Sequence, residues 1–177
     1  MLDSRWYAVS VRSNFERVVA QSLRQKEYEI LLPAYLSKRR WSDRTKMTEC
    51  ALFPGYLFCR MDLQQRVPLL NTPGVVSLVG VGRCAMPVDT AEIEAIQRIV
   101  ASGLPVEPTP FLKVGQTVHI NEGPLAGLKG IVVTNKNQSR LVVSVEMLQR
   151  SVTVEIERGW ADPAGKPHFL AVACRAA

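Results

Sequence analysis

A proline-rich stretch divides this sequence into two parts. Residues 101–113 hold three prolines and one glycine in thirteen positions. Proline fixes φ and has no amide donor, so the stretch excludes continuous helix and disfavours most strand pairing. We therefore expect an extended linker over residues 104–112. It would separate a first domain, residues 1–103, from a second domain, residues 113–160, with an extension at 161–177.

The first part alternates strands with helices. The runs rich in β-forming residues are 6–11, 55–61 and 75–79. Ser13 and Glu16 have the spacing of a capping box, which predicts a helix over residues 14–26. Asp89 and Glu92 repeat that spacing ahead of a second apolar helical stripe. This order predicts a sheet covered by helices on at least one face.

The second part is all-β by pattern. Its β-branched runs are residues 117–121, 129–134, 141–145 and 151–156. The breaks between them carry Gly123-Pro124, Gly127 and the polar stretch 135–139, which suit turns. Several short antiparallel strands in about fifty residues predict a small barrel.

Composition excludes several classes of protein. The chain has 177 residues, of which 47% are hydrophobic and 21% charged, as in globular proteins. No nucleotide-binding glycine loop occurs, and neither histidine lies in a catalytic motif, so we expect no enzyme and no cofactor. Four dispersed cysteines without a CxxC pair predict buried thiols and no metal site; they are Cys50, Cys59, Cys84 and Cys174.

Targeting signals are also missing from the sequence. The first twelve residues lack an apolar signal core, and no apolar run approaches the roughly 18 residues of a membrane span. We expect a cytoplasmic, monomeric protein with no membrane contact.

Positive charge is concentrated in one segment. The net charge is +6, and residues 38–46 contain five cations and one anion. The cations would neutralise phosphates, and the aromatic ring among them would stack on an unpaired base. A solvated hairpin and a protein contact remain open alternatives. The candidate nucleic-acid-binding residues are Arg12, Lys38, Arg39, Arg40, Trp41, Arg44 and Lys46.

Several motifs resemble one family. Trp6-Tyr7, the run from Phe53 to Phe58 and the run from Thr72 to Val75 resemble the NGN domain of NusG transcription factors. Residues 118–132 resemble the KOW motif that follows it in this family. The resemblance covers residues 5–157. It implies an α+β fold, with an RNP-like antiparallel sheet and helices followed by a small SH3-like KOW β-barrel.

The resemblance also implies a function and partners. NusG factors regulate transcription elongation, antitermination and termination. Their NGN domain grips the β′ clamp helices of RNA polymerase and lies close to non-template DNA. Their KOW domain recruits Rho or a small-subunit ribosomal protein, depending on the member. Val81, Ile93 and Ile96 fall where members place pocket residues, although a core role explains both isoleucines equally well.

Strand alternation adds two residues to the expected polymerase-binding pocket. Leu57, Cys59 and Met61 share one face of their strand, and this set forms the better core. If it faces the two helices, Tyr56 and Phe58 form an apolar patch on the other side of the sheet. The alternative is that both faces are covered and the two aromatics belong to the core.

Within this family we expect a specialised paralogue, with a general housekeeping NusG as the alternative. The stretches 39–44 and 52–58 are similar to specialised NusG paralogues of the UpxY and RfaH groups, whereas the KOW sequence is similar to general NusG. The His-Thr-Thr-Thr run by which RfaH contacts the other polymerase lobe is missing around residues 65–72. A KOW-type ribosomal or RNA-binding accessory protein is the remaining alternative, but such a protein has no need of the 53–58 motif.

Overall fold

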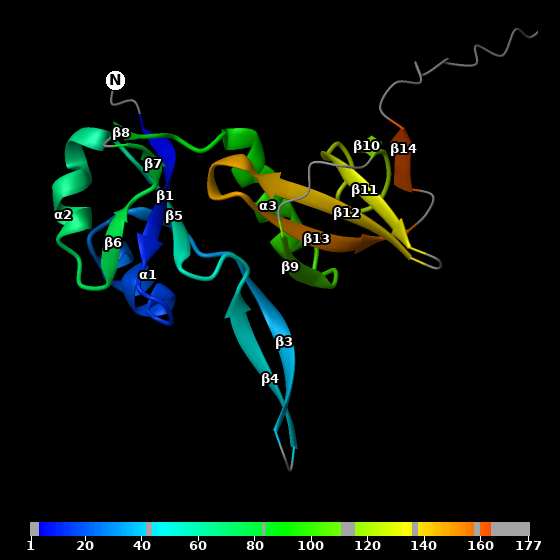
Figure 1. Ribbon diagram of the computed structural model, residues 1–177, viewed down its shortest axis with the longest axis horizontal. Coiled ribbons are helices and arrows are strands. Elements are labelled where there is room, and N and C mark those ends of the chain that lie inside the picture. The colour runs from blue at the N-terminus through cyan, green and yellow to red at the C-terminus, as the bar shows by residue number, and fades with distance from the viewer. Residues whose placement is uncertain are drawn as a thin grey trace, which may run out of the picture.

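The computed structural model has two β-rich halves with a helix between them (Figure 1). We call residues 4–101 the N-terminal half and residues 106–163 the C-terminal half. The structure describes residues 4–41, 44–82, 84–110, 116–135, 138–157 and 160–163.

The N-terminal half is built on a four-stranded antiparallel sheet with the order β2-β5-β1-β6. The central pair is β1 and β5, in register with Val9 opposite Leu57. Strand β1 is rich in aromatic and β-branched residues, which suit a pleated and buried surface. The bounds are β1 Arg5–Val11, β2 Glu29–Leu31, β5 Tyr56–Met61 and β6 Val75–Leu78.

Three α-helices accompany this sheet: α1 Glu16–Gln25, α2 Arg66–Leu70 and α3 Thr90–Ala101. A 3₁₀ turn, η1 Leu63–Gln65, leads into α2. The predicted cap of the last helix is confirmed, because the Asp89 carboxylate accepts a hydrogen bond of 2.9 Å from the Ala91 amide.

The predicted capping box at Ser13 is wrong. Helix α1 starts at Glu16 behind Phe15, whose side chain makes no capping bond. Asn14 has a φ of 66°, so a tight turn leaves Ser13 outside the helix. The Glu16 carboxylate instead accepts a hydrogen bond of 2.8 Å from the Gly55 amide. The carboxylate therefore ties α1 to the turn before β5.

Both faces of the sheet are covered. One face packs with α1 and α2 in a core that includes Tyr7, Val9, Val19, Leu23, Leu57, Met61 and Leu69. The other face packs with α3 in a second core: Trp6, Ala8, Phe53, Phe58, Ile93, Ile96 and Ile99. Leu57, Cys59 and Met61 share a core face as predicted. The expectation that both helices lie on that face is wrong, because α3 covers the opposite one.

Two hairpins extend from the N-terminal half. The long one pairs β3 Ala34–Trp41 with β4 Arg44–Ala51 and projects away from the rest of the molecule (Figure 1). The short one pairs β7 Gly80–Val81 with β8 Cys84–Ala85 just before α3.

The C-terminal half is an antiparallel sheet with the order β14-β10-β11-β12-β13-β9. The four predicted strands are present, and their register is continuous from β10 to β13. Among the described residues no pairing joins β14 to β9, so the predicted barrel is not closed by backbone pairing. The bounds are β9 Val106–Pro110, β10 Gln116–Ile120, β11 Lys129–Asn135, β12 Gln138–Val145, β13 Arg150–Ile156 and β14 Ala161–Pro163, with a 3₁₀ turn η2 Glu146–Leu148.

The proline-rich segment contains a strand, which corrects the expectation that it avoids pairing. Strand β9 runs antiparallel to β13, with Glu107 opposite Thr153 and Thr109 opposite Ser151. The prolines at 108 and 110 alternate with these residues, and β9 is an edge strand. An edge strand uses the amides on one side only, so prolines on the other side cost it no ladder bond.

The start of the expected extension also belongs to the sheet. Residues of β14 pair with β10, with Ala161 opposite Ile120. The Asn121 amide donates a 2.8 Å hydrogen bond to the Trp160 carbonyl. Gly123 has a φ of 74°, and a Cβ at this glycine would lie 2.8 Å from the Trp160 ring. The turn at Gly123 therefore requires glycine for its backbone conformation and for the close approach of the indole.

Candidate functional site

The aromatic pair predicted for the pocket divides between surface and core. Phe58 is 0% exposed and lies edge-to-face with Phe53, with ring centroids 5.6 Å apart. Tyr56 is half-buried at the start of β5. The alternative in which the aromatics are core therefore holds for Phe58, while Tyr56 retains accessible surface.

Tyr56 lies at the boundary between the two halves. The Arg150 guanidinium carbon lies 5.4 Å from the centroid of the Tyr56 ring. Arg150 begins β13 and therefore belongs to the C-terminal half. A cation over an aromatic face at this distance is attractive. The C-terminal half thus covers part of the surface that Tyr56 would offer to a partner.

Helix α3 is the second point at which the halves meet. The Glu146 amide donates a 3.3 Å hydrogen bond to Glu92, and the Arg98 guanidinium donates to the Ala126 carbonyl. Burial raises the pKa of Glu92, and repulsion from Asp89 and Glu146 adds to the effect, while the bond from the Glu146 amide opposes it. A carboxylate whose charge is disfavoured thus lies at the junction of the halves.

The remaining pocket candidates have different environments. Ile93 and Ile96 lie on the buried face of α3 and belong to the same core as Phe58. Val81 is 76% exposed on the short hairpin and belongs to neither core. The structure therefore brings Phe58, Ile93 and Ile96 together as core residues and leaves Tyr56 and Val81 with accessible surface.

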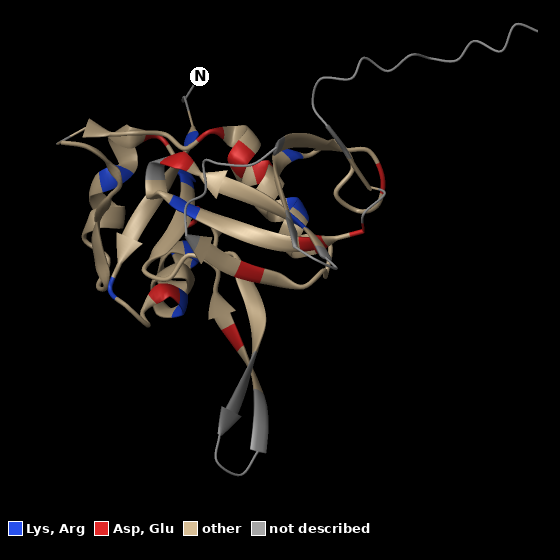
Figure 2. Ribbon diagram, turned by 45° about the vertical axis from the view of Figure 1, so that its right-hand side comes forward, with Lys and Arg blue, Asp and Glu red and all other residues tan. Residues whose placement is uncertain are grey.

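The basic segment, residues 38–46, forms the outer part of the long hairpin. Its backbone register places Trp41 opposite Arg44 and Arg39 opposite Lys46. The side chains at positions 38–46 lie outside the described residues, so their role in nucleic-acid binding stays a prediction. On the described elements basic and acidic residues are interspersed (Figure 2).

Apolar side chains accompany the charged segment, which sequence reasoning missed. Leu36 is 67% and Met47 is 55% exposed on the two strands of the hairpin. A narrow two-stranded ribbon has no layer to bury its apolar positions, so alternation alone does not reveal which of them remain accessible.

An ion pair connects the hairpin to α1. The Arg17 guanidinium contacts the Glu49 carboxylate and carbonyl, joining the helix to β4. Arg17 is therefore neutralised locally, whereas the side chain of Arg12 is exposed ahead of the helix. The Arg12 amide donates a 2.9 Å hydrogen bond to the Gly74 carbonyl, which fixes its place beside β6.

A cavity of about 710 Å³ lies between α1 and the base of the hairpin. Its lining combines Arg17 and Arg24 with Gln21, Tyr35 and Glu49. The sequence did not indicate this cavity, because its walls come from three separate segments, within residues 14–24, 32–35 and 48–54.

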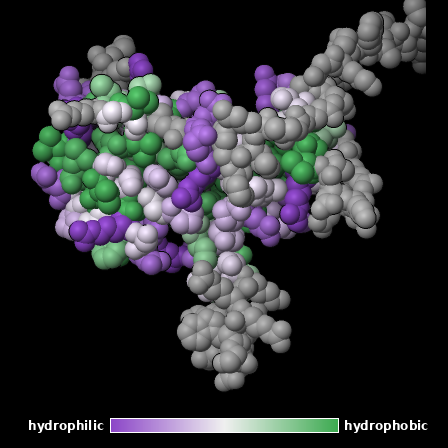
Figure 3. Space-filling model, in the orientation of Figure 1, coloured by the Kyte–Doolittle hydropathy of each residue, from purple (hydrophilic) through white to green (hydrophobic). Residues whose placement is uncertain are grey.

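Apolar surface also gathers over α2 and β6 (Figure 3). The exposed residues on these elements include Val67, Leu70 and Val76. This surface could not be predicted from the sequence, because the same residues fit the apolar pattern of a buried helix and strand.

Clusters of metal-ligating side chains and membrane-spanning helices are absent from the described parts of the chain. No cluster of three or more potential metal ligands occurs there. None of the described helices is long and apolar enough to cross a membrane.

The comparisons with known proteins agree with the motifs. The family described as "Transcription termination factor nusG" matches residues 4–97. The "Transcription termination/antitermination protein NusG" of Vibrio vulnificus is 32% identical over 170 residues, covering 88% of this chain and 93% of that protein. The protein of the same name from Pseudomonas aeruginosa is 32% identical over 171 residues, covering 88% of this chain and 96% of that protein.

Structural similarity extends across both halves. The structure described as "Domain interaction in Thermotoga maritima NusG" has a TM-score of 0.58 and 22% identity, and covers 92% of this chain and 98% of that one. This likeness supports the fold. Together with the sequence matches over most of the chain, it leads to one conclusion: the chain belongs to the NusG family, whose members are transcription factors and not enzymes.

Proposed function

We propose that this protein binds the β′ clamp helices of RNA polymerase through its N-terminal half and suppresses pausing or termination. The observation that carries the proposal is the match to NusG proteins over 88% of the chain, which spans both halves. Tyr56 supports a binding role, because it is an aromatic with accessible surface above a rigid core. We propose Tyr56 and Val81 as direct contacts, and Phe58, Ile93 and Ile96 as the core that holds their surface in shape.

Polymerase binding at Tyr56 requires the Arg150 guanidinium to leave the Tyr56 ring. Arg150 lies over the Tyr56 ring in this structure, so a second partner has no access to that side of the ring. An exposed cation over an aromatic ring contributes only about 0.5–1 kcal/mol, so this one contact is easily replaced, while the buried cluster around α3 also joins the halves. We therefore propose that the clamp helices replace Arg150 on Tyr56.

The basic hairpin is the proposed nucleic-acid contact. It projects beyond the body of the molecule, so it can reach a strand that the sheet cannot (Figure 1). The proposed ligand is the non-template DNA strand, which carries phosphates for the cations and unpaired bases for Trp41. Arg12 would extend the same surface along α1.

The C-terminal half is the proposed recruiting module. We propose that the protein is a cytoplasmic monomer. Its C-terminal half, once released from the N-terminal half, would bind Rho or a small-subunit ribosomal protein. Transcript mapping with and without the protein would separate a general factor, with effects on most operons, from a specialised one, with effects on a few long operons.

Binding of a β′ clamp-helix fragment to the full chain tests the proposal. Tyr56→Ala should weaken binding by about 2 kcal/mol, as truncation of an aromatic anchor does. Arg150→Ala is the control, since it removes the covering cation and keeps the Tyr56 ring; it should bind as well as the natural chain or better. Normal binding by a folded Tyr56→Ala variant would refute the proposed contact.

A further inference from the structure

The connection between the halves is partly built into the C-terminal sheet. Strand β9 forms the edge of that sheet, and its register with β13 extends from Val106 to Pro110. The Glu155 amide donates a 3.2 Å hydrogen bond to the Pro105 carbonyl, which continues the ladder one position before the strand. Part of the segment expected to act as a linker is therefore paired with β13 as a strand.

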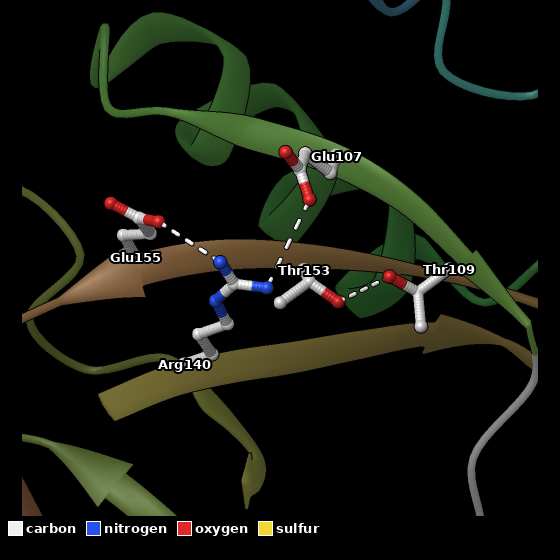
Figure 4. A network of polar contacts seen from close by, with 5 residues as sticks. All are labelled: Glu107, Thr109, Arg140, Thr153 and Glu155. Atoms are coloured by element: carbon white, nitrogen blue, oxygen red, sulfur yellow. Dashed lines mark hydrogen bonds and ion pairs between the residues drawn. The ribbon is translucent and has the colours of Figure 1, made fainter. Parts of the chain in front are cut away.

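Side chains reinforce this pairing (Figure 4). Arg140 on β12 reaches Glu155 on β13 at 3.2 Å and Glu107 on β9 at 3.9 Å, so one guanidinium spans three strands. The Thr109 hydroxyl shares a hydrogen bond with the Thr153 hydroxyl. These contacts hold β9 at two alternate positions, Glu107 and Thr109, which share one face of the strand.

Pairing of β9 with β13 shortens the tether, which is the unpaired chain that connects α3 to the C-terminal sheet. Helix α3 ends at Ala101 and β9 begins at Val106, which leaves only four residues between them. Four extended residues span at most about 14 Å. Residues 102–104 are also folded back, since the Ser102 hydroxyl donates to the Ile99 carbonyl at 2.7 Å and accepts from the Leu104 amide at 3.3 Å.

Release of β9 would lengthen the tether. The next strand, β10, begins at Gln116, so fourteen residues would then connect α3 to the sheet. Fourteen extended residues span at most about 50 Å. Because β9 is an edge strand and the Glu107 side chain is 69% exposed, β9 can detach from β13 through the loss of a few contacts while the central strands stay paired.

We propose that β9 is a releasable strap that controls how far the C-terminal half can move from α3. With β9 paired, the C-terminal half stays near Tyr56 and α3. With β9 released, it gains more than three times the reach. The strap is a property of the chain itself; its use in uncovering Tyr56 rests on the function proposed above.

Small-angle X-ray scattering and amide hydrogen exchange on the full chain test the strap. The double variant Glu107→Gln with Thr109→Val removes the ion pair and the hydroxyl contact while keeping side-chain volume. We expect exchange at the amides of residues 107 and 109 to accelerate at least tenfold, with an increase in the radius of gyration. Unchanged exchange within β12 checks that the sheet stays folded.

Two further variants make the outcome decisive. Glu29→Gln is the matched control. Glu29 lies on another edge strand, β2, and its replacement removes an exposed ion pair with Arg60 on β5. This variant should change neither the amide exchange of β9 nor the radius of gyration. Insertion of eight Gly and Ser residues after Ser102 supplies a long tether directly, and in that background the double variant should no longer increase the radius. Accelerated exchange with an unchanged radius would overturn the proposal, as would unchanged exchange.

Clamp-helix binding separates the two proposals. If the double variant increases the radius but leaves binding unchanged, the strap stands and its link to Tyr56 fails. If the radius does not respond while Tyr56→Ala still weakens binding, the strap fails and the proposed function stands.

Discussion

Replacement of Phe58 by alanine is the most direct test of the core described here. The ring is fully buried between β5 and α3, and it contacts Phe53 edge-to-face. Large-to-small truncation of a buried phenylalanine costs about 3–5 kcal/mol, which includes about 0.5–1.5 kcal/mol for an aromatic pair. A domain of ordinary stability has about 5–15 kcal/mol in total, so the loss is a large part of it.

Urea unfolding of the full chain measures this loss. Leu57→Ala on the opposite face should lose about 2–5 kcal/mol through its own cavity. Tyr56→Ala should lose less than either, because its ring is only half-buried. If Phe58→Ala unfolds within about 1 kcal/mol of the natural chain, the ring is not in a packed core and the assignment of α3 to this face is wrong.

Four further predictions concern other parts of the molecule. If the hairpin contacts DNA phosphates, the salt slope of DNA binding should fall by about 2–3 units when alanine replaces three cations, Arg39, Arg40 and Arg44. Because the pKa of Glu92 is raised in the folded protein, protonated Glu92 contributes stability at acidic pH, and this contribution is lost as the pH rises from the ordinary glutamate pKa through the raised pKa. In thermal melts, the stability of Glu92→Gln should therefore depend less on pH than that of the natural chain. Gly123→Ala should lower the stability of the C-terminal half by about 1–3 kcal/mol in thermal melts, since its Cβ would strike the Trp160 ring at a positive φ. Burial raises the pKa of Cys59 to about 12, so a thiol reagent at neutral pH should label exposed Cys84 before Cys59, which should react only after unfolding.

The alternation of side chains along β5 could be predicted from the sequence, but the helices that cover each face of the sheet could not. Alternation correctly groups Leu57 with Met61 and places Phe58 on the other side. The stripe of isoleucines in α3 indicates that this helix has an apolar face. It does not indicate which side of the sheet receives that face, because the path from β6 through the short hairpin decides it.

The proline-rich segment shows a different limit of sequence reasoning. Prolines exclude helix and central strands, and both exclusions hold for residues 106–110. An edge strand is still permitted when prolines alternate with residues whose amides point inward. That distinction depends on a partner strand 40 residues away, which local composition does not reveal.

The nucleic-acid candidates were found from composition, because five cations in nine residues are visible without a fold. The cavity beside α1 was invisible for the opposite reason. Arg17 and Arg24 are ordinary exposed helical positions in sequence, and only the docking of the hairpin through Glu49 turns that side of the helix into a wall. Local charge is therefore a better guide to the hairpin than to the surface around it.

Helix α3 explains why the two halves are less independent than the sequence suggests. Its isoleucines pack on the N-terminal sheet, while Ala95 and Glu92 lie toward Val142 and Glu146 of the C-terminal half. Alanine adds little to an amphipathic pattern, yet its small side chain lets the second sheet approach the helix closely. The same buried cluster therefore runs through the helix into both sheets. It follows that a partner which displaces the C-terminal half uncovers one side of α3 as well as Tyr56, so binding must offset the exposure of both surfaces.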